Sequence, residues 1–259
     1  MAVALVTGGT SGIGAAFARI LAAQGYDLVL VARDVSRLEN MAVELRALGR
    51  SVEVLRADLA DRTDVDRVAA RLEDPENPVQ MLVNNAGFGD HTGLLEPGTA
   101  ALDLSFEVMC RAVYVLSGAA ARGMLPQGAG RIVNVSSTAG FLPMGAYSAI
   151  KAWVTTYTES LSVELNGTGV TTTALCPGWV RTEFHERAGI SASKIPNFMW
   201  LDAEPLVTEC LRDVNKGKVI SIPTVRYRVL IWLARVAPKS WLRVVARLMT
   251  SSRRPAVAR

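Results

Sequence analysis

The sequence of 259 residues predicts an α/β fold, a single doubly wound domain with a parallel sheet of about seven strands and helices on both faces. Two observations predict it. Short apolar runs alternate with segments of helical period as far as Pro223, and a glycine-rich turn follows the first apolar run. Strict alternation is typical of parallel strands joined by helices that cover both faces. We therefore expect one domain over residues 1–223 and a helical tail over 224–259.

The expected strands are continuous apolar runs, because strands covered on both faces bury every side chain. They span 2–7, 27–32, 51–57, 79–84, 131–136, 170–175 and 219–223. The helices between them are expected from the glycine turn to residue 23, around apolar positions 38–48, and over 64–72, 102–124 and 146–165. Two more, 226–236 and 239–249, are separated by Pro238, which breaks helical periodicity.

The glycine-rich turn contains Gly8, Thr10, Ser11, Gly12, Ile13 and Gly14. Glycines at such a turn let the backbone approach a pyrophosphate, which then rests on the N-terminus of the following helix. The spacing, Gly-x-x-x-Gly-x-Gly, is not the commoner Gly-x-Gly-x-x-Gly, and it also suits a plain strand–helix turn. Its place directly after a buried strand favours the binding of a dinucleotide cofactor.

The end of the second strand bears on which dinucleotide is used. An acidic residue there hydrogen-bonds a ribose 2′-hydroxyl, whereas an arginine suits a 2′-phosphate. This chain has Ala32 followed by Arg33, and Asp34 is placed to cap the next helix. NADP(H) is therefore favoured over NAD(H), with a plain solvated charge as the alternative role for Arg33.

A phenol and an ammonium, Tyr147 and Lys151, are four residues apart and lie on one face of a predicted helix. The strand before them ends in two hydroxyls, Ser136 and Ser137. A tyrosine with its ordinary pKa of about 10 exchanges protons poorly near neutrality, and a neighbouring cation favours the phenolate. The arrangement suits proton transfer to a carbonyl oxygen. Alone, Tyr-x-x-x-Lys is a weak signal.

Taken together, these motifs resemble the short-chain dehydrogenase/reductase family, nearly to Pro223. The resemblance rests on six motifs in order: Thr7-Gly8-x-x-x-Gly12-x-Gly14, Asp58-Leu59, Asn84-Asn85-Ala86-Gly87, Ser136-Ser137, Tyr147-x-x-x-Lys151 and Pro177-Gly178-x-x-x-Thr182. It implies a Rossmann-type core, a nicotinamide cofactor and hydride transfer to or from a carbonyl or alcohol carbon.

The resemblance also implies roles. The catalytic residues would be Ser137, which binds the substrate oxygen, Tyr147, the general acid/base, and Lys151, which binds the nicotinamide ribose and lowers the pKa of Tyr147. The cofactor would contact Gly8, Thr10, Ser11, Gly12, Ile13, Gly14, Arg33, Asp58, Leu59, Asn85, Ala86, Gly87, Tyr147, Lys151, Pro177, Gly178 and Thr182. Of these, Asp58 would face the adenine, Asn85, Ala86 and Gly87 the adenine ribose side, and Pro177, Gly178 and Thr182 the carboxamide. Plain capping is the alternative for Asn84, Asn85 and Thr182.

Two positions depart from the family pattern. The family usually has an asparagine in the long helix before the serine strand, where it supports a proton-relay water, and this chain has Met109. A thioether cannot order a water in that way. In addition, only nine residues separate Ser137 from Tyr147, fewer than the dozen usual in the family, so the loop 141–145 is expected to reshape the substrate pocket.

Residues 183–201 correspond to the family's substrate lid. Their apolar residues are Phe184, Ile190, Ile195, Phe198, Met199, Trp200 and Leu201. This composition favours a lipophilic substrate, although a packed loop has the same composition. His185 is as compatible with a surface position as with substrate contact.

The tail carries most of the charge imbalance. Residues 214–259 hold 11 Lys or Arg and no Asp or Glu, so the other residues hold 17 of the 28 basic residues and all 24 acidic ones. Lys239, Arg243 and Arg247 recur on one helical face with Trp241 among apolar neighbours, a pattern typical of helices at a membrane interface. Packing against a partner subunit or the pocket is an equal alternative. Nucleic acid is not expected as a partner, because no binding motif accompanies the charge.

Three widely spaced cysteines, Cys110, Cys176 and Cys210, predict buried thiols in a reducing compartment, and two histidines without ligand spacing predict no metal site. We expect a cytoplasmic enzyme, with possible contact to the inner membrane face, that forms a homo-dimer or homo-tetramer by resemblance. The predicted activity is NADPH-dependent reduction of a lipophilic ketone, aldehyde or oxoacyl compound, a function in lipid metabolism. Two alternatives stay open: a catalytically weak cofactor-binding module, and an oxidative alcohol or hydroxysteroid dehydrogenase.

Overall fold

The computed structural model describes residues 2–89, 93–95, 97–183 and 196–250. Its main sheet has seven strands in the order β3-β2-β1-β4-β5-β6-β9, and every neighbouring pair is parallel. The strands are β1 (Val3–Thr7), β2 (Asp27–Ala32), β3 (Val52–Arg56), β4 (Met81–Asn84), β5 (Gly130–Val135), β6 (Val170–Leu175) and β9 (Ile220–Ser221). The strand order reverses beside β1, where the carboxyl ends of parallel strands form a crevice suited to a ligand.

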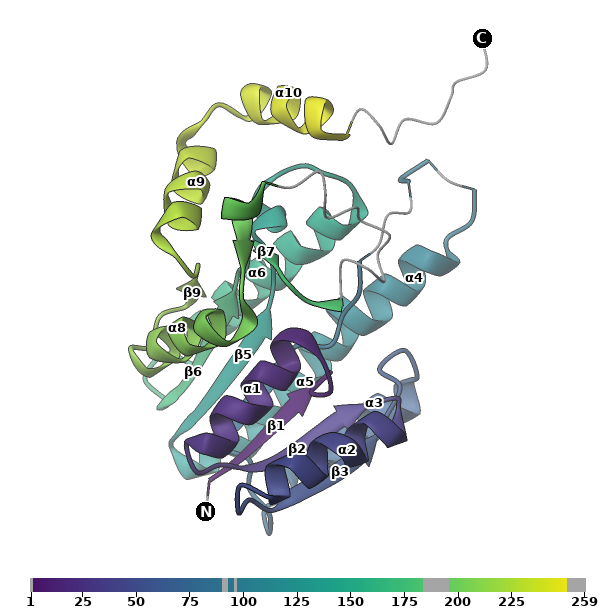
Figure 1. Cartoon of the computed structure of the whole chain (residues 1–259), viewed down its shortest axis with the longest axis vertical. Helices are drawn as coiled ribbons and strands as arrows, with labels where there is room; N and C mark the ends of the chain where they lie inside the picture. The colour runs from purple at the N-terminus through teal and green to yellow at the C-terminus, as the bar shows by residue number, and fades with distance from the viewer. Residues whose placement is uncertain (1, 90–92, 96, 184–195, 251–259) are drawn as a thin grey trace.

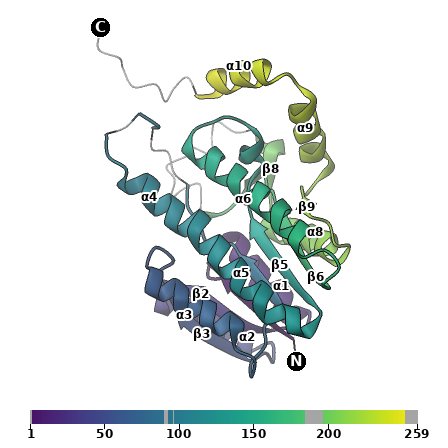
Figure 2. The same cartoon turned by 180° about the vertical axis from the view of Figure 1, so that it is seen from behind.

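Helices cover both faces of this sheet (Figures 1 and 2). One face packs against α1 (Gly12–Ala23), α2 (Val35–Arg46) and α8 (Ala203–Asn215), and the other against α3 (Arg62–Glu73), α5 (Ala112–Met124) and α6 (Ala146–Glu164). Within β1, Ala4 and Val6 belong to the first core and Leu5 to the second. This alternation explains why the strand is apolar at every position from Val3 to Val6. The predicted doubly wound α/β fold is confirmed.

Three features differ from the sequence-based expectation. The helix α8 was not predicted, although Leu206, Cys210 and Val214 lie on its buried face with the four-residue spacing of an amphipathic helix. The expected helix 102–124 is instead α4 (Ala100–Phe106), a π-helical turn Glu107–Arg111, and α5. A second, two-stranded parallel sheet pairs β7 (Trp179–Val180) with β8 (Trp200–Leu201).

The continuous helical stretch Ala100–Gln127 is long and apolar enough to cross a membrane, with a mean hydropathy of 1.3 in its most apolar window, 61% of which is buried. A core helix passes the same test, and this one packs on the sheet between α3 and α6. The three cysteines are free thiols and all are buried, as predicted.

The tail forms α9 (Val225–Val236) and α10 (Lys239–Thr250), which lie beyond the carboxyl end of the sheet (yellow in Figure 1). Tyr227 and Ile231 are buried, so one face of α9 packs against the rest of the molecule. The guanidinium of Arg235 lies 4.8 Å from the ring centre of Phe141, in the short loop before Tyr147. The first tail helix therefore packs beside the predicted active site.

Candidate active site

The glycine turn after β1 is held in a shape that needs glycine. Gly8 and Gly12 have φ angles of +65° and +53°, which side chains disfavour. A Cβ on Gly14 would lie 2.1 Å from the carbonyl oxygen of Gly8, so the turn could not close around a larger residue. A Cβ on Gly12 would lie 3.1 Å from the Thr182 methyl group. The glycine turn and the Thr182 motif are thus brought into contact across the crevice.

Two polar side chains join this turn to the end of β4. Asn85 donates through Nδ2 to the carbonyl oxygens of Thr7 at 3.0 Å and Gly8 at 3.1 Å. In return, Thr7 Oγ1 accepts from the backbone N–H groups of Asn85 at 2.9 Å and Ala86 at 3.1 Å. The side-chain amide of Asn85 therefore stabilises the glycine turn. The sequence pattern attributed the shape of this turn to its glycines alone. Thr7, a supporting residue, was quoted in the motif but given no role.

The neighbouring Asn84 belongs to a buried polar network and not to the crevice. Its Nδ2 donates to Ser117 Oγ and to Asn134 Oδ1, each at 3.0 Å. Asn134 Nδ2 donates in turn to Thr158 Oγ1 at 3.1 Å. The network joins β4, β5, α5 and α6, and because its amides and hydroxyls satisfy one another, it fixes how these elements pack.

The N-terminus of α1 has the features of a pyrophosphate site. Its N-cap, Ser11, makes no side-chain capping hydrogen bond, whereas Asp34 caps α2 by accepting from the N–H of Arg37 at 3.0 Å and Asp61 caps α3. The first-turn amides of α1 thus lack the side-chain acceptor that the other two helices have, and an anionic phosphate suits them. The residues present therefore fit a dinucleotide.

The residues that would lie around the adenosine end come from β2 and β3. Arg33 is exposed at the end of β2, and Asp34 caps α2 as predicted. Asp58 Oδ1 accepts from the N–H of Ala60 at 3.1 Å, and Leu59 is buried. Arg37 donates through Nη2 to both carboxylate oxygens of Glu183, at 2.8 and 3.0 Å, and this ion pair links the first turn of α2 to the residue after Thr182.

The three predicted catalytic residues converge at the carboxyl end of β5. The hydroxyl of Ser137 lies close to that of Tyr147 and favours the ionised form of the phenol. Ser137 Oγ also accepts from the N–H of Ala139 at 3.1 Å, which fixes its rotamer. The ammonium of Lys151 is buried and lies 5.7 Å from the ring centre of Tyr147. Ser136 is turned away, and its hydroxyl donates to the carbonyl oxygen of Lys151 at 2.7 Å.

Burial dominates the electrostatics of this group. It raises the pKa of Tyr147 to about 12, and the nearby hydroxyl of Ser137 is the opposing influence. Burial likewise lowers the pKa of Lys151 to about 8. In the protein alone, burial therefore raises the Tyr147 pKa, and the lowering of this pKa by Lys151 stays a prediction.

Met109 lies in the π-helical turn and is fully buried beside Cys110 and Ile150. A Cβ on Gly87 would lie 3.3 Å from the Met109 sulfur and 3.8 Å from Lys151 Nζ. The thioether is thus packed next to Gly87, close to the ammonium, where the resembling family has an amide. A π-helical turn widens a helix locally and is frequent at functional sites.

The Pro177–Gly178 motif is fixed from two sides. The carbonyl oxygen of Pro177 accepts from Thr138 through N–H at 2.9 Å and through Oγ1 at 3.1 Å. Gly178 is covered by the ring of Tyr227 from α9, which sequence reasoning did not identify. Of the expected lid, Glu183 and residues 196–201 are described, and Phe184, His185, Ile190 and Ile195 lie outside the described residues. Phe198 is 67% exposed.

Comparison with known proteins places these features in a family. The model of the short chain dehydrogenase family matches residues 2–191. A putative ketoacyl reductase of granaticin polyketide synthesis from Streptomyces violaceoruber is 39% identical over 193 residues, 71% of this chain and 70% of its own. A short-chain dehydrogenase from Sphingobium yanoikuyae, solved with NADPH, is 32% identical with a TM-score of 0.83, covering 100% of this chain and 99% of its own. A bulky-bulky ketone specific alcohol dehydrogenase from Comamonas testosteroni is 28% identical with a TM-score of 0.78, covering 100% and 97%. The NADPH bound to the Sphingobium yanoikuyae protein agrees with the NADP(H) cofactor predicted from the sequence.

Proposed function

Because this chain belongs to the short-chain dehydrogenase family, we propose that it is an NADPH-dependent reductase of a lipophilic ketone, aldehyde or oxoacyl compound. The observation that carries the proposal is the convergence of Ser137 and Tyr147 beside the buried Lys151 at the carboxyl end of β5. When bound, NADPH supplies the hydride. The protein supplies the orientation and one proton.

The roles of the three side chains follow from their chemistry. Tyr147 holds its proton at neutral pH, since its pKa is about 12, and can give it to an oxygen that gains negative charge. The hydroxyl of Ser137 is held by Ala139 and can donate to the same oxygen. The cation of Lys151 lies near enough to stabilise the resulting phenolate, and it is the group that we propose binds the nicotinamide ribose.

The choice of NADPH rests on Arg33, an exposed guanidinium at the end of β2 where an acidic residue would favour NADH. The NADPH in the similar Sphingobium protein supports it. A lipophilic substrate is supported by the apolar residues of the expected lid, such as Phe198 and Trp200, and by two similar proteins, a ketoacyl reductase and a bulky-bulky ketone specific alcohol dehydrogenase. The test is oxidation of NADPH against a panel of apolar ketones, aldehydes and oxoacyl thioesters.

Met109 favours a second candidate, a cofactor-binding module with weak or no turnover. Met109 fills the position near Lys151 with a sulfur that cannot order a relay water. This candidate predicts tight NADPH binding, no turnover with any substrate of the panel, and gain of turnover in Met109→Asn. The oxidative direction, from an alcohol or hydroxysteroid, is tested by the same panel in reduced form with NADP⁺.

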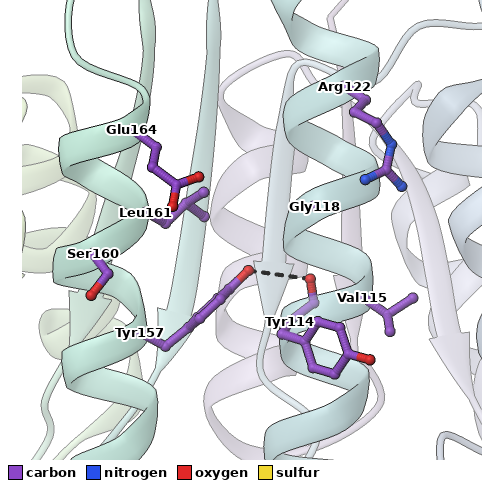
Figure 3. A pocket seen from close by; sticks show the side chains of 8 residues that line it. All are labelled: Tyr114, Val115, Gly118, Arg122, Tyr157, Ser160, Leu161 and Glu164. Carbon is purple, nitrogen blue, oxygen red and sulfur yellow. Dashed lines mark hydrogen bonds between the residues drawn. The ribbon is translucent and has the colours of Figure 1, made fainter.

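A homo-oligomer is proposed through α5 and α6. Their outer surfaces enclose a recess in which Tyr157 donates to the carbonyl oxygen of Tyr114 at 3.2 Å (Figure 3). The recess is lined by Tyr114, Val115, Gly118, Arg122, Tyr157, Ser160, Leu161 and Glu164. It mixes aromatic rings with both signs of charge, as protein interfaces do. Light scattering at several concentrations, with Tyr114→Lys as the disrupting variant, tests this proposal.

We also propose that the protein is cytoplasmic and that the exposed face of its tail contacts the anionic lipid surface of the inner face of the membrane. On α9 the apolar residues Val225, Val229, Trp232 and Val236 form one stripe, each at least 50% exposed, and Trp241 on α10 is 71% exposed. The tail contains no acidic residue, so pairing two tails would place cations against cations, whereas anionic lipid complements them.

Sedimentation with phosphatidylglycerol vesicles tests the membrane contact, with phosphatidylcholine vesicles as the control lipid. Trp232→Ser together with Trp241→Ser should abolish binding, and Val43→Ser, which changes an equally exposed apolar residue on α2, should not. If no vesicle binds and the double variant changes the oligomeric mass, a second copy covers this face and the membrane proposal is wrong.

A further inference from the structure

Tyr227 of α9 packs directly on the backbone of Gly178. A Cβ built on Gly178 would lie 1.9 Å from Cζ of the Tyr227 ring and 2.2 Å from Cε1. The tyrosine is 4% exposed, so its ring is enclosed in this position. Gly178 is therefore required because an aromatic ring from the tail occupies the space of a side chain.

The hydroxyl of Tyr227 joins two segments that both border the crevice. It accepts a hydrogen bond from the N–H of Trp179 at 3.0 Å and donates one to the carbonyl oxygen of Met199 at 2.7 Å. Burial raises the pKa of Tyr227, so the hydroxyl remains a donor at neutral pH. One side chain thus connects the turn that follows β6 with the described end of the expected lid, segments twenty residues apart in sequence.

The neighbouring residue strengthens this connection. The guanidinium of Arg226 donates to the carbonyl oxygen of Trp200 at 2.9 Å and to that of Phe198. Residues 198–200 therefore have all three of their carbonyl oxygens bound by two consecutive residues of α9. Such a set of backbone contacts constrains position without depending on which side chains the segment carries.

The residue before α9 has a strained backbone conformation that neighbouring groups hold in place. Thr224 has a φ of +71°, a conformation that a β-branched residue adopts only when its surroundings impose it. Its N–H donates to Glu209 Oε2 at 3.0 Å, and Glu209 Oε1 accepts from Arg228 at 2.7 Å. A carboxylate of α8 thus holds both the strained residue and the first turn of α9, so Tyr227 is delivered to Gly178 at a defined angle.

We propose that Tyr227 is a positioning residue for the nicotinamide half of the cofactor site, and that it sets the Pro177–Trp179 turn and the Met199 segment relative to each other. The inference rests on the proposed function, in which Pro177 and Gly178 face the nicotinamide carboxamide. It makes α9 a part of the active site and assigns it a role apart from any membrane contact of the tail.

The test separates the two halves of the cofactor. Binding of NADPH and of adenosine 2′,5′-bisphosphate, which lacks the nicotinamide half, is measured by calorimetry for the full chain and for Tyr227→Phe. The variant keeps the ring on Gly178 and removes only the hydroxyl. Its NADPH affinity should fall roughly five- to tenfold, the effect of one neutral hydrogen bond, with bisphosphate affinity unchanged within about twofold. Tyr26→Phe is the matched control, since the Tyr26 hydroxyl accepts from Arg131 at 3.2 Å near the opposite end of the sheet, and it should change neither affinity.

A double-mutant cycle provides the second measurement. Gly178→Ala should weaken NADPH binding at least as much as Tyr227→Phe, because the added methyl collides with the ring. In a Tyr227→Ala background the same change should cost much less, since the space is open.

Equal losses of affinity for both ligands in Tyr227→Phe would show a general structural role, and no loss for either ligand would show no role. Each of these results overturns the inference. If the unmodified chain binds the bisphosphate but not NADPH, or binds neither, the proposed cofactor chemistry is wrong and the inference is overturned with it.

Discussion

The ammonium group of Lys151 donates a hydrogen bond to the carbonyl oxygen of Val135 at 2.9 Å. This contact joins α6, which carries Tyr147, to the end of β5, just before Ser137. The hydroxyl of Ser136 strengthens the junction from the other side through the carbonyl oxygen of Lys151. The relative placement of the phenol and the serine hydroxyl is thus set by hydrogen bonds to backbone carbonyl groups.

Lys151 should make the stability of the protein depend on pH. Its pKa is about 8 in the folded chain and 10.5 in the ordinary reference state, so between these values the unfolded chain binds more protons than the folded one. The free energy of unfolding from this group therefore rises as the pH increases from 8 to 10.5, by at most about 3 kcal/mol. Urea denaturation from pH 7 to pH 9.5 measures the rise. Lys151→Met should remove this part of the slope, and an unchanged slope in that variant would contradict the prediction.

Asn85→Ala should loosen the glycine turn. The change removes two hydrogen bonds, to the carbonyl oxygens of Thr7 and Gly8, and leaves them without their amide donor. We expect a loss of about 1–3 kcal/mol in the free energy of unfolding and weaker NADPH binding. Chemical denaturation and calorimetry measure the two effects. Asn77→Ala, which removes an exposed amide bonded to Asp74, is the control and should leave NADPH binding intact; a similar loss of NADPH binding in both variants would refute the assignment.

Arg33→Ser should shift the cofactor preference. If the guanidinium binds a 2′-phosphate, its loss should reduce kcat/KM for NADPH by roughly tenfold or more and leave that for NADH nearly unchanged. The ratio of the two kcat/KM values is the measurement. Arg19→Ser is a suitable control, because Arg19 is an exposed arginine of α1 that pairs with Glu44 at 2.6 Å. If the ratio is the same in Arg33→Ser and in the unmodified chain, Arg33 does not bind the 2′-phosphate and is only a solvated surface charge.

Much of this architecture could be predicted from the sequence, because burial on both faces leaves a continuous apolar pattern. The strands 27–32 and 170–175 have the predicted bounds, and the Asp34 cap lies where a capping side chain was expected. The contact between Tyr227 and Gly178 could not be predicted, since it joins residues 49 positions apart and depends on the strained entry of α9 at Thr224. The π-helical turn at Met109 also leaves no periodic signal, because five residues are too few to change the pattern of the long helix.

The role of Asn85 was missed for a related reason. A motif locates an asparagine after a strand, but only the sheet order places β4 beside β1, where its amide reaches the glycine turn. The effect of burial on Tyr147 likewise depends on how the surrounding elements pack. Local pattern therefore selected the candidate residues, whereas the contacts that hold them depend on the tertiary structure.

The central claim is that Tyr147 donates the proton during reduction, and Tyr147→Phe tests it most directly. The variant keeps the ring and removes the acid, so kcat for the best ketone of the panel should fall by roughly 10²–10⁴-fold while the dissociation constant for NADPH stays within about threefold. Tyr157→Phe, in which a tyrosine of the same helix loses a hydroxyl outside the crevice, should retain its kcat. A Tyr147→Phe variant that turns over at the rate of the unmodified chain would contradict the account.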